Sequence, residues 1–163
     1  MAPSKAPVLL LGGTGKVARR IAHQLAATHQ PVLVATRKGS AVAGGVLFDW
    51  NDRETWGNAF AAAQPGKPAK GGPPISAIFL VCPPILDVLS IMSEYIDFAR
   101  SQGVRRFVLL SSSAVEKGGV AMGKVHSYLS DLGSKGEVEW AVLRPTWFQR
   151  LWKLILRLRD MES

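Results

Sequence analysis

Gly13, Gly15 and Ala18 lie near the start of the chain, three small residues at a fixed spacing. They follow the apolar run Val8–Leu11 and precede a segment with helical periodicity. In such a pattern one glycine permits a sharp turn, the next lets the backbone approach a pyrophosphate, and a small third residue lets helix and strand pack closely. The free N–H groups of the helix start then face the anion. The spacing therefore predicts dinucleotide binding at this turn.

A basic pair about 20 residues further on indicates which dinucleotide is bound. NAD-preferring sites carry Asp or Glu there, which accepts hydrogen bonds from the ribose hydroxyls. This chain has Arg37 and Lys38 instead, after Thr36. A carboxylate would repel a 2′-phosphate, whereas Arg37 can form charge-assisted hydrogen bonds with it. The pair favours NADP(H), and the alternative is a solvated pair of cations after a strand.

Other candidate residues follow later predicted strands. Asp49 is either an acceptor for the adenine amino group or the first residue of a loop. Cys82 is read as a packing residue rather than a nucleophile, because no histidine or helix start is near it in sequence. His23 and His29 are expected at the surface, and His126 is the better candidate for chemistry. The predicted cofactor-binding residues are Gly12, Gly13, Thr14, Gly15, Lys16, Val17, Arg37, Asp49, Pro83 and Ser111.

The elements that must position these residues alternate between strand and helix. Continuously apolar runs predict strands buried on both faces, and apolar residues at i, i+3 and i+4 predict helices. The expected strands are 8–11, 31–37, 45–49, 75–81, 106–111 and 139–143. The expected helices are 16–28, 53–63, 85–102 and 120–132. Val17 is expected on the apolar side of the first and Leu86 on that of the third, which Gly103 is expected to stop. Residues 64–74, rich in Pro, Gly and Lys, are expected to form a flexible loop. The pattern predicts an α/β fold with one doubly wound parallel sheet, a single Rossmann-like domain over residues 1–148.

Size and composition agree with one globular domain. The chain has 163 residues, 47% of them hydrophobic and 20% charged, which is typical of a soluble protein. No apolar run approaches the roughly 20 residues of a membrane span, and no signal sequence is evident, so a cytoplasmic location is expected. The net charge is +8, but the cations are scattered without interleaved aromatics, which argues against nucleic-acid binding. The single cysteine excludes an internal disulfide and a cysteine-based metal site, and no metal is expected.

A familiar catalytic pair is missing. Short-chain dehydrogenases use Tyr-x-x-x-Lys, in which the lysine lies one helical turn after the tyrosine and lowers its pKa. Tyr95 and Tyr128 are followed four residues later by Ala99 and Leu132. Lys124 and Tyr128 have the spacing in reverse order, so they are the catalytic candidates, and an exposed helix face explains them equally well.

Four segments together resemble one family. They begin at Leu10 (Leu-Leu-Gly-Gly-Thr-Gly-Lys-Val), Pro31 (Pro-Val-Leu-Val-Ala-Thr-Arg), Phe107 (Phe-Val-Leu-Leu-Ser-Ser-Ser-Ala) and Ala141 (Ala-Val-Leu-Arg-Pro-Thr-Trp-Phe). They are similar to NmrA-like atypical short-chain reductases and, more narrowly, to the fungal agroclavine and festuclavine dehydrogenases of ergot alkaloid synthesis. The likeness extends over about residues 7–148. It implies NADPH-dependent reduction of a cyclic iminium formed from chanoclavine-I aldehyde.

That implied chemistry is compatible with the missing tyrosine. Reduction of a ketone develops an alkoxide that needs a proton donor. An iminium carbon is already electrophilic, and hydride addition gives a neutral amine. The protein then has mainly to hold the nicotinamide in line with that carbon.

The chain departs from the family pattern after Phe148. Residues 149–163 could form a basic amphipathic helix, with Leu151, Leu154, Ile155 and Leu158 on its apolar side. This tail replaces the family's substrate lobe, so the resemblance is to an N-terminal half, and a second polypeptide is expected to supply the lobe. A membrane-surface helix is the less favoured alternative for the tail. Two functions compete with the enzyme: an NADP-binding regulator without turnover, and an inactive remnant.

Overall fold

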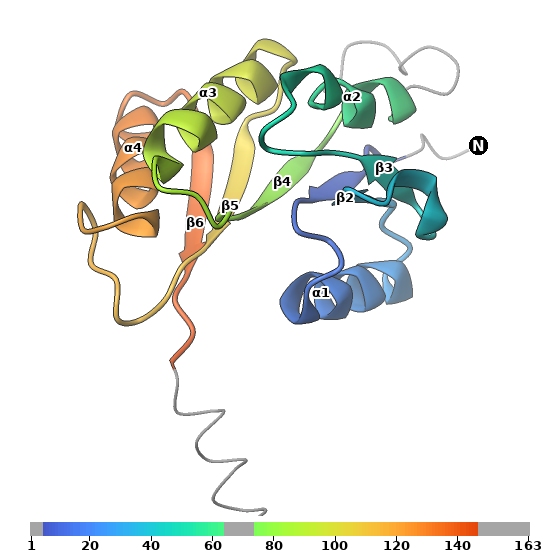
Figure 1. Cartoon of the computed structure of the whole chain (residues 1–163), viewed down its shortest axis with the longest axis horizontal. Coiled ribbons are helices and arrows are strands. Elements are labelled where there is room, and N and C mark those ends of the chain that lie inside the picture. The colour runs from blue at the N-terminus through green and yellow to red at the C-terminus, as the bar shows by residue number, and fades with distance from the viewer. Residues whose placement is uncertain (1–4, 64–73, 147–163) are drawn as a thin grey trace, which may run out of the picture.

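The computed structural model describes residues 5–63 and 74–146. Nearly all of the loop expected at 64–74, and the whole tail expected at 149–163, lie outside the described residues. Six parallel strands form one sheet in the order β3-β2-β1-β4-β5-β6, as Figure 1 shows. The strands are β1 (Val8–Leu10), β2 (Val32–Thr36), β3 (Gly45–Leu47), β4 (Ala77–Val81), β5 (Arg106–Leu110) and β6 (Glu139–Leu143). The predicted doubly wound sheet is confirmed, and its order reverses between β1 and β4.

Helices cover the two faces of this sheet unequally. The helices are α1 (Lys16–Ala27), α2 (Asn58–Ala62), α3 (Val88–Ser101) and α4 (Met122–Ser134), with short 3-10 turns at Gly39–Ala41 and Arg53–Thr55. Right-handed crossovers place α1 on one face and α2, α3 and α4 on the other. Figure 1 shows α1 apart from the other three helices. In the described part of the chain, α1 is therefore alone on its face.

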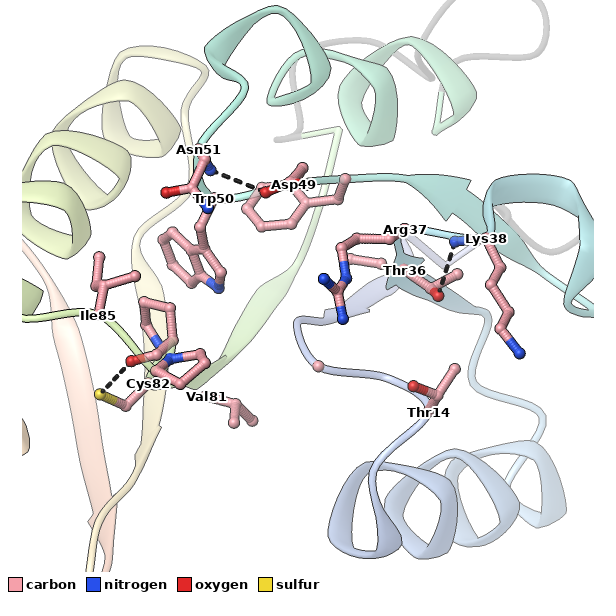
Figure 2. Close-up of a pocket in the computed structure, with 15 residues that line it drawn as sticks. Thr14, Thr36, Arg37, Lys38, Asp49, Trp50, Asn51, Val81, Cys82 and Ile85 are labelled. Atoms are coloured by element: carbon pink, nitrogen blue, oxygen red, sulfur yellow. Dashed lines mark hydrogen bonds between the residues drawn. The ribbon is translucent and has the colours of Figure 1, made fainter.

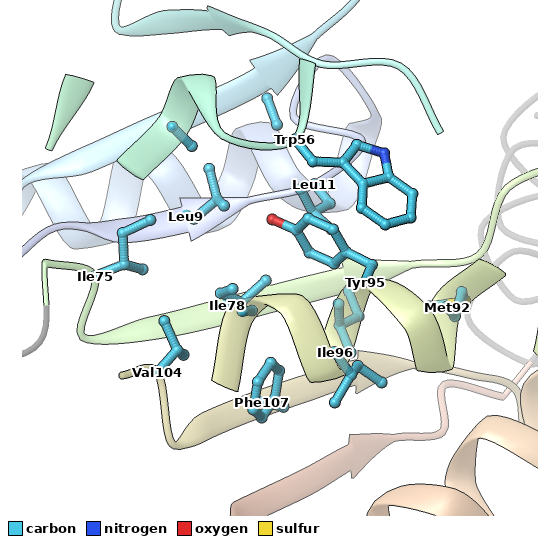
Figure 3. Packing of buried hydrophobic residues seen from close by; sticks show 14 of the residues in the cluster. Leu9, Leu11, Trp56, Ile75, Ile78, Met92, Tyr95, Ile96, Val104 and Phe107 are labelled. Carbon is cyan, nitrogen blue, oxygen red and sulfur yellow. The ribbon is translucent and has the colours of Figure 1, made fainter. Parts of the chain in front are cut away.

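The main core lies between the sheet and α3. Leu9, Ile78 and Phe107 point from three strands toward Tyr95 and Ile96 of α3, and all five are at most 1% exposed, as seen in Figure 3. A smaller cluster lies under α1. It is formed by Leu10, Ala18 and Phe79, with Val108 and Leu110 partly buried against it. The fully apolar strand pattern therefore reflects two buried faces near the centre of the sheet.

The helix expected at 53–63 is only partly correct. A 3-10 turn at Arg53–Thr55 is followed by the short α2, which begins after Gly57. Asp52 accepts a hydrogen bond from the N–H of Glu54 at 3.1 Å, and the Thr55 hydroxyl donates to the Asp52 carbonyl at 2.6 Å. These local side-chain bonds favour a turn over a continuous helix.

The expected buried sides of two helices also need correction. α3 begins at Val88 rather than at Ile85, because the Asp87 side chain caps it by accepting from the N–H of Ser90. Leu86, expected on the apolar side of this helix, precedes it and is fully exposed. Val17, expected on the buried side of α1, is 40% exposed.

Candidate functional site

The glycine turn after β1 depends on residues that lack a side chain. Gly12 has φ +64°, a conformation that favours glycine. A Cβ at Gly13 would lie 2.3 Å from Cγ1 of Val34, and one at Gly15 would lie 3.1 Å from the Gly12 carbonyl oxygen. The structure therefore assigns the sharp turn to Gly12, and the lack of a Cβ at Gly13 lets the turn pack against β2.

The start of α1 leaves backbone donors available. Gly15 is the N-cap residue, and no side chain caps the helix there. The first N–H groups of any α-helix have no partner within the helix, and here Lys16 and Val17 are the first two residues. This arrangement suits an anion such as a pyrophosphate.

A cleft of about 420 Å³ opens at the carboxyl ends of four strands. Its walls come from the segments that follow β1, β2, β3 and β4. The lining residues are Gly12, Thr14, Ala35, Thr36, Arg37, Lys38, Phe48, Asp49, Trp50, Asn51, Val81, Cys82, Pro83, Pro84 and Ile85. Figure 2 shows Thr14 and Arg37 across the cleft from Val81 and Cys82. This is the switch point of the sheet, where doubly wound folds bind ligands.

The cleft brings together five of the predicted site residues: Gly12, Thr14, Arg37, Asp49 and Pro83. The other predicted residues lie outside its lining. Gly13 is buried in the turn, Gly15, Lys16 and Val17 belong to the start of α1, and Ser111 follows β5.

Arg37 is the cation best placed to meet a ligand. It follows β2 directly. The N–H of the next residue, Lys38, donates a hydrogen bond to the Thr36 hydroxyl at 3.2 Å. In Figure 2 the Arg37 guanidinium extends into the cleft, whereas the Lys38 side chain extends away from it. Among the ion pairs of residues 5–63 and 74–146, none involves Arg37. Its positive charge is thus available to an anion.

Asp49 both begins a turn and lines the cleft. One carboxylate oxygen accepts from the N–H of Asn51 at 2.9 Å, and the Asp49 carbonyl accepts from Nε1 of Trp56 at 3.2 Å. The two interpretations of Asp49 are therefore compatible in space, since its second carboxylate oxygen makes no hydrogen bond within the described chain. The half-buried Trp50 beside it packs edge-on against Phe48 at 5.1 Å and Tyr95 at 5.4 Å.

The opposite wall is formed by the residues after β4. The N–H of Ile85 donates to the Pro83 carbonyl at 3.0 Å, which closes a tight turn. The Cys82 thiol donates to the same carbonyl at 3.4 Å and packs against the main core. Burial raises the pKa of Cys82, so the thiolate is disfavoured, in line with a packing role.

Ser111 directly follows β5, and Arg144 directly follows β6. Ser111 is 6% exposed, and its hydroxyl has no hydrogen-bond partner in the described chain. Arg144 donates to the carbonyls of Ser112 at 3.3 Å and Ser113 at 3.1 Å, and to the Glu116 carboxylate at 3.1 Å. One guanidinium thus ties the segment after β5 to the end of β6, and the buried Ser111 hydroxyl remains available for one hydrogen bond.

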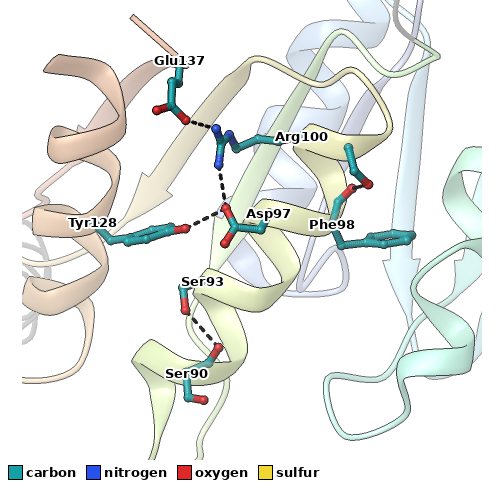
Figure 4. A network of polar contacts seen from close by, with 8 residues as sticks. Ser90, Ser93, Asp97, Phe98, Arg100, Tyr128 and Glu137 are labelled. Carbon is teal, nitrogen blue, oxygen red and sulfur yellow. Dashed lines mark hydrogen bonds and ion pairs between the residues drawn. The ribbon is translucent and has the colours of Figure 1, made fainter. Parts of the chain in front are cut away.

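Lys124 and Tyr128 lie on α4, and neither lines the cleft. The Tyr128 hydroxyl donates to the Asp97 carboxylate of α3 at 2.7 Å, and Asp97 also pairs with Arg100, which pairs with Glu137. We call these four residues the Asp97 network; Figure 4 shows it. Burial and the bond to Asp97 raise the pKa of Tyr128 to about 12. This geometry gives Tyr128 a structural contact between helices.

The three histidines differ in exposure. His23 and His29 are exposed, as expected. The His126 ring lies 5.4 Å from the Trp140 ring, and its Nδ1 is buried without a partner in the described residues. Burial, and then the charges of Lys117 and Arg144, lower the pKa of His126. Within the described ranges, no three His, Cys, Asp or Glu side chains gather in a way that would hold a metal ion.

Sequence reasoning missed several lining residues, above all Trp50, Asn51 and Ile85. Their position directly after a strand end was the available signal.

No helix in residues 5–63 and 74–146 is long and apolar enough to cross a membrane.

Comparison with known proteins identifies the relatives. No family model matches the chain. It is 47% identical over 143 residues to festuclavine synthase II of Penicillium roqueforti, covering 86% of this chain and 47% of that protein. It is 46% identical to agroclavine dehydrogenase of Claviceps purpurea, covering 86% of this chain and 46% of that protein. Over most of its length the chain is therefore similar to festuclavine and agroclavine dehydrogenases. The chain spans about half the length of these relatives.

Solved structures show the same fold at much lower identity. Triphenylmethane reductase of Citrobacter sp., complexed with NADP(H), superposes with a TM-score of 0.60 at 19% identity, covering 85% of this chain and 48% of that one. A short-chain dehydrogenase/reductase superfamily protein of Agrobacterium tumefaciens, with bound NAD, gives a TM-score of 0.58 at 20% identity, covering 84% and 48%. These similarities confirm the Rossmann-type fold.

Proposed function

We propose that this chain is the NADP-binding part of an NADPH-dependent reductase of the festuclavine and agroclavine dehydrogenase type. Its substrate would be the cyclic iminium derived from chanoclavine-I aldehyde. The observation that carries the proposal is Arg37 in the cleft, without a carboxylate partner in the described chain. The names of relatives at 46–47% identity support a dehydrogenase over the matched region.

The residues present fit a nicotinamide dinucleotide. The turn at Gly12–Gly15 leaves room where a Cβ would meet neighbouring atoms, and the uncapped start of α1 offers N–H donors to the pyrophosphate. The Arg37 guanidinium would bind the 2′-phosphate, and the free carboxylate oxygen of Asp49 would accept from the adenine amino group. Pro83 would line the opposite wall, and the buried Ser111 hydroxyl would hydrogen-bond at the far end of the site.

The proposed chemistry asks little of the protein beyond orientation. When bound, NADPH supplies a hydride, which adds to the iminium carbon and leaves a neutral amine with no proton to deliver. The chain's own residues bind the coenzyme and hold it at the strand ends. Lys124 and Tyr128 would then not be needed for turnover, because the iminium is already electrophilic.

A second polypeptide is part of the proposal. The chain spans about half the length of its curated relatives, and the described residues form a cleft at the strand ends. We propose that the lobe that binds the substrate is supplied by a second polypeptide. An NADP-binding regulator without turnover is the second candidate, because neither of the two catalytic candidates, Lys124 and Tyr128, is among the residues that line the cleft.

Calorimetry with NADPH and NADH on the full chain tests the coenzyme assignment. We expect wild type to bind NADPH more tightly than NADH, and Arg37→Asp to weaken NADPH binding at least tenfold while sparing NADH. Arg105→Asp is the matched control, since Arg105 is also an exposed cation but precedes β5 at the other end of the strands. It should leave both affinities unchanged.

Three results test the proposal and its alternatives. If folded protein shows no binding heat with NADPH and none with NADH, the proposal is overturned. An unchanged preference in Arg37→Asp overturns the assignment of the 2′-phosphate site. Adding the iminium and a candidate second polypeptide then separates the functions: consumption of NADPH supports the reductase, and tight binding without consumption supports the regulator.

A further inference from the structure

Ser40 lies in an exposed turn directly after the cations of the proposed coenzyme site. Arg37 and Lys38 line the cleft, and the 3-10 turn Gly39–Ala41 follows them. Ser40 is exposed in the middle of that turn, whereas Gly39 beside it is buried. Three peptide units join Arg37 to Ser40, so their Cα atoms are at most about 11 Å apart. A charge on Ser40 would therefore act on Arg37 over a distance close to the Debye length, about 10 Å at moderate salt.

The residues before Ser40 have the pattern that basophilic protein kinases select. These kinases bind a substrate serine through cations two and three residues before it, which pair with carboxylates of the kinase. Ser40 has Lys38 and Arg37 at these two positions. No other serine or threonine of the 163 residues has Lys or Arg at both. The pattern therefore selects Ser40 alone.

The sequence around Ser40 carries positive charge without acidic residues. Residues 1–48 contain no aspartate or glutamate, and the first acidic residue of the chain is Asp49. Among the ion pairs of residues 5–63 and 74–146, none includes a residue before Arg53. An acidic kinase cleft would thus meet no repulsion near Ser40, and a phosphate there would be attracted to unpaired cations.

Few backbone contacts oppose opening of the turn. The N–H of Ala41 donates to the Lys38 carbonyl at 3.2 Å, and the N–H of Val42 donates to the Gly39 carbonyl at 3.3 Å. Both distances lie at or beyond the long end of the usual range for such bonds. Because the turn lies between β2 and β3, the segment can extend into a kinase cleft without loss of the pairing between these strands.

We propose that Ser40 is a phosphorylation site for a basophilic protein kinase and that its phosphate lowers the affinity of the chain for NADPH. The γ-phosphoryl group of a nucleoside triphosphate passes to Oγ of Ser40. The bond to the nucleoside diphosphate breaks, a P–O bond to Oγ forms, and the hydroxyl proton goes to a base of the kinase. This inference rests on the proposed function, and it adds a means of regulating the same site.

The phosphate would oppose NADPH in two ways. It carries a charge of about −1.5 to −2 at pH 7 and would pair with Arg37, so that the guanidinium is no longer available to the 2′-phosphate of the coenzyme. It would also repel that 2′-phosphate, which has the same sign of charge. NADH has no 2′-phosphate, so its affinity should change much less. A loss confined to NADPH distinguishes this effect from general damage to the cleft.

Phosphate incorporation tests the modification site. The full chain is incubated with ATP and the catalytic subunit of cyclic-AMP-dependent protein kinase, and mass spectrometry locates the phosphate. We expect wild type to be phosphorylated at Ser40 and Ser40→Ala to take up no phosphate in this turn. Arg37→Ala should slow incorporation at least tenfold, because it removes one of the two cations that the kinase binds.

Calorimetry with the phosphorylated chain tests the consequence. We expect NADPH to bind at least tenfold more weakly than it binds the unmodified chain, NADH to be nearly unaffected, and the loss to shrink as salt is raised. Ser40→Asp should show a smaller loss in the same direction, because a carboxylate carries less charge than a phosphate.

Ser101→Asp is the matched control for an added charge. Ser101 is also exposed, but it ends α3 shortly before β5 begins, at the amino ends of the strands and away from the cleft. Both coenzyme affinities should stay unchanged in this variant. Circular dichroism shows whether each variant folds, and Ser40→Ala should bind NADPH as wild type does.

Three outcomes would overturn the inference. One is phosphate uptake that is absent, or that is equal in wild type and Ser40→Ala. Another is a chain phosphorylated at Ser40 that binds NADPH as tightly as before. The third is an equal loss of NADPH and NADH. Failure of the proposed function looks different, because the unmodified folded chain would then bind neither coenzyme. The effect on coenzyme binding would fail with it, while mass spectrometry would still decide whether Ser40 accepts phosphate.

Discussion

The cleft and the Asp97 network use polar groups in opposite ways. In the network, Tyr128, Asp97, Arg100 and Glu137 satisfy one another between α3 and α4. In the cleft, Arg37 has no ion-pair partner within the described chain, and the nearby start of α1 is uncapped. Paired groups hold two helices together, whereas unpaired groups retain the capacity to bind. Tyr128 therefore forms a structural contact, and the unpaired Arg37 lies at the proposed coenzyme site.

The largest effect that would test this contrast is expected at the glycine turn. Gly13→Ala places a Cβ against the stiff Val34 side chain, so it should lower the free energy of unfolding by about 1–3 kcal/mol and weaken NADPH binding. Denaturant unfolding and calorimetry measure the two effects. Gly57→Ala is the control, since a Cβ there meets nothing within 4 Å. If both substitutions behave alike, the turn is not tightly packed.

A smaller effect is expected in the Asp97 network, on stability alone. Tyr128→Phe removes one hydrogen bond and should lower the free energy of unfolding by about 0.5–1.5 kcal/mol, with NADPH affinity unchanged. Loss of coenzyme binding in this variant would break the distinction between the two regions.

The stability difference between wild type and Tyr128→Phe should depend on pH. The pKa of Tyr128 is raised to about 12 in the folded protein, so the folded state keeps a proton that the unfolded chain releases from about pH 10. The stabilising contribution of Tyr128 is therefore complete below about pH 10 and is lost as the pH rises toward 12. Unfolding at several pH values should show the gap between wild type and Tyr128→Phe narrowing above pH 10.

The smallest effect is expected at an exposed ion pair outside both regions. Arg53 pairs with Glu94 at 2.6 Å, and both side chains are about half exposed. Solvent screens such pairs strongly. Arg53→Ala should therefore shift the unfolding midpoint less than Tyr128→Phe does, and the shift should disappear in high salt. A larger loss would show that charge pairing at the surface matters as much as the Asp97 network.

Much of the sheet and part of the cleft could be predicted from local sequence. Apolar runs and glycines determine where strands end, and parallel strands bring those ends together. This is why Gly12, Arg37, Asp49 and Pro83, far apart in the chain, could be expected at one cleft. Gly103, expected to stop a helix, follows α3 by two residues with φ +92°.

What escaped prediction depends on contacts between distant residues. Tyr128 meets Asp97, 31 positions away, and no periodicity reveals such a partner. Val17 has the spacing of a buried residue yet is exposed, because helical periodicity says which residues are apolar but not whether another layer covers them. The break at Gly57 escaped because the side-chain bonds of Asp52 and Thr55 compete with helix at short range.

The three hydrogen bonds of Arg144 couple the segment after β5 to the end of β6. Residues 112–116 can move away from the sheet only if these bonds break or if the end of β6 moves with them. We therefore expect a ligand or partner that displaces this segment to displace the end of β6 as well, in one cooperative step.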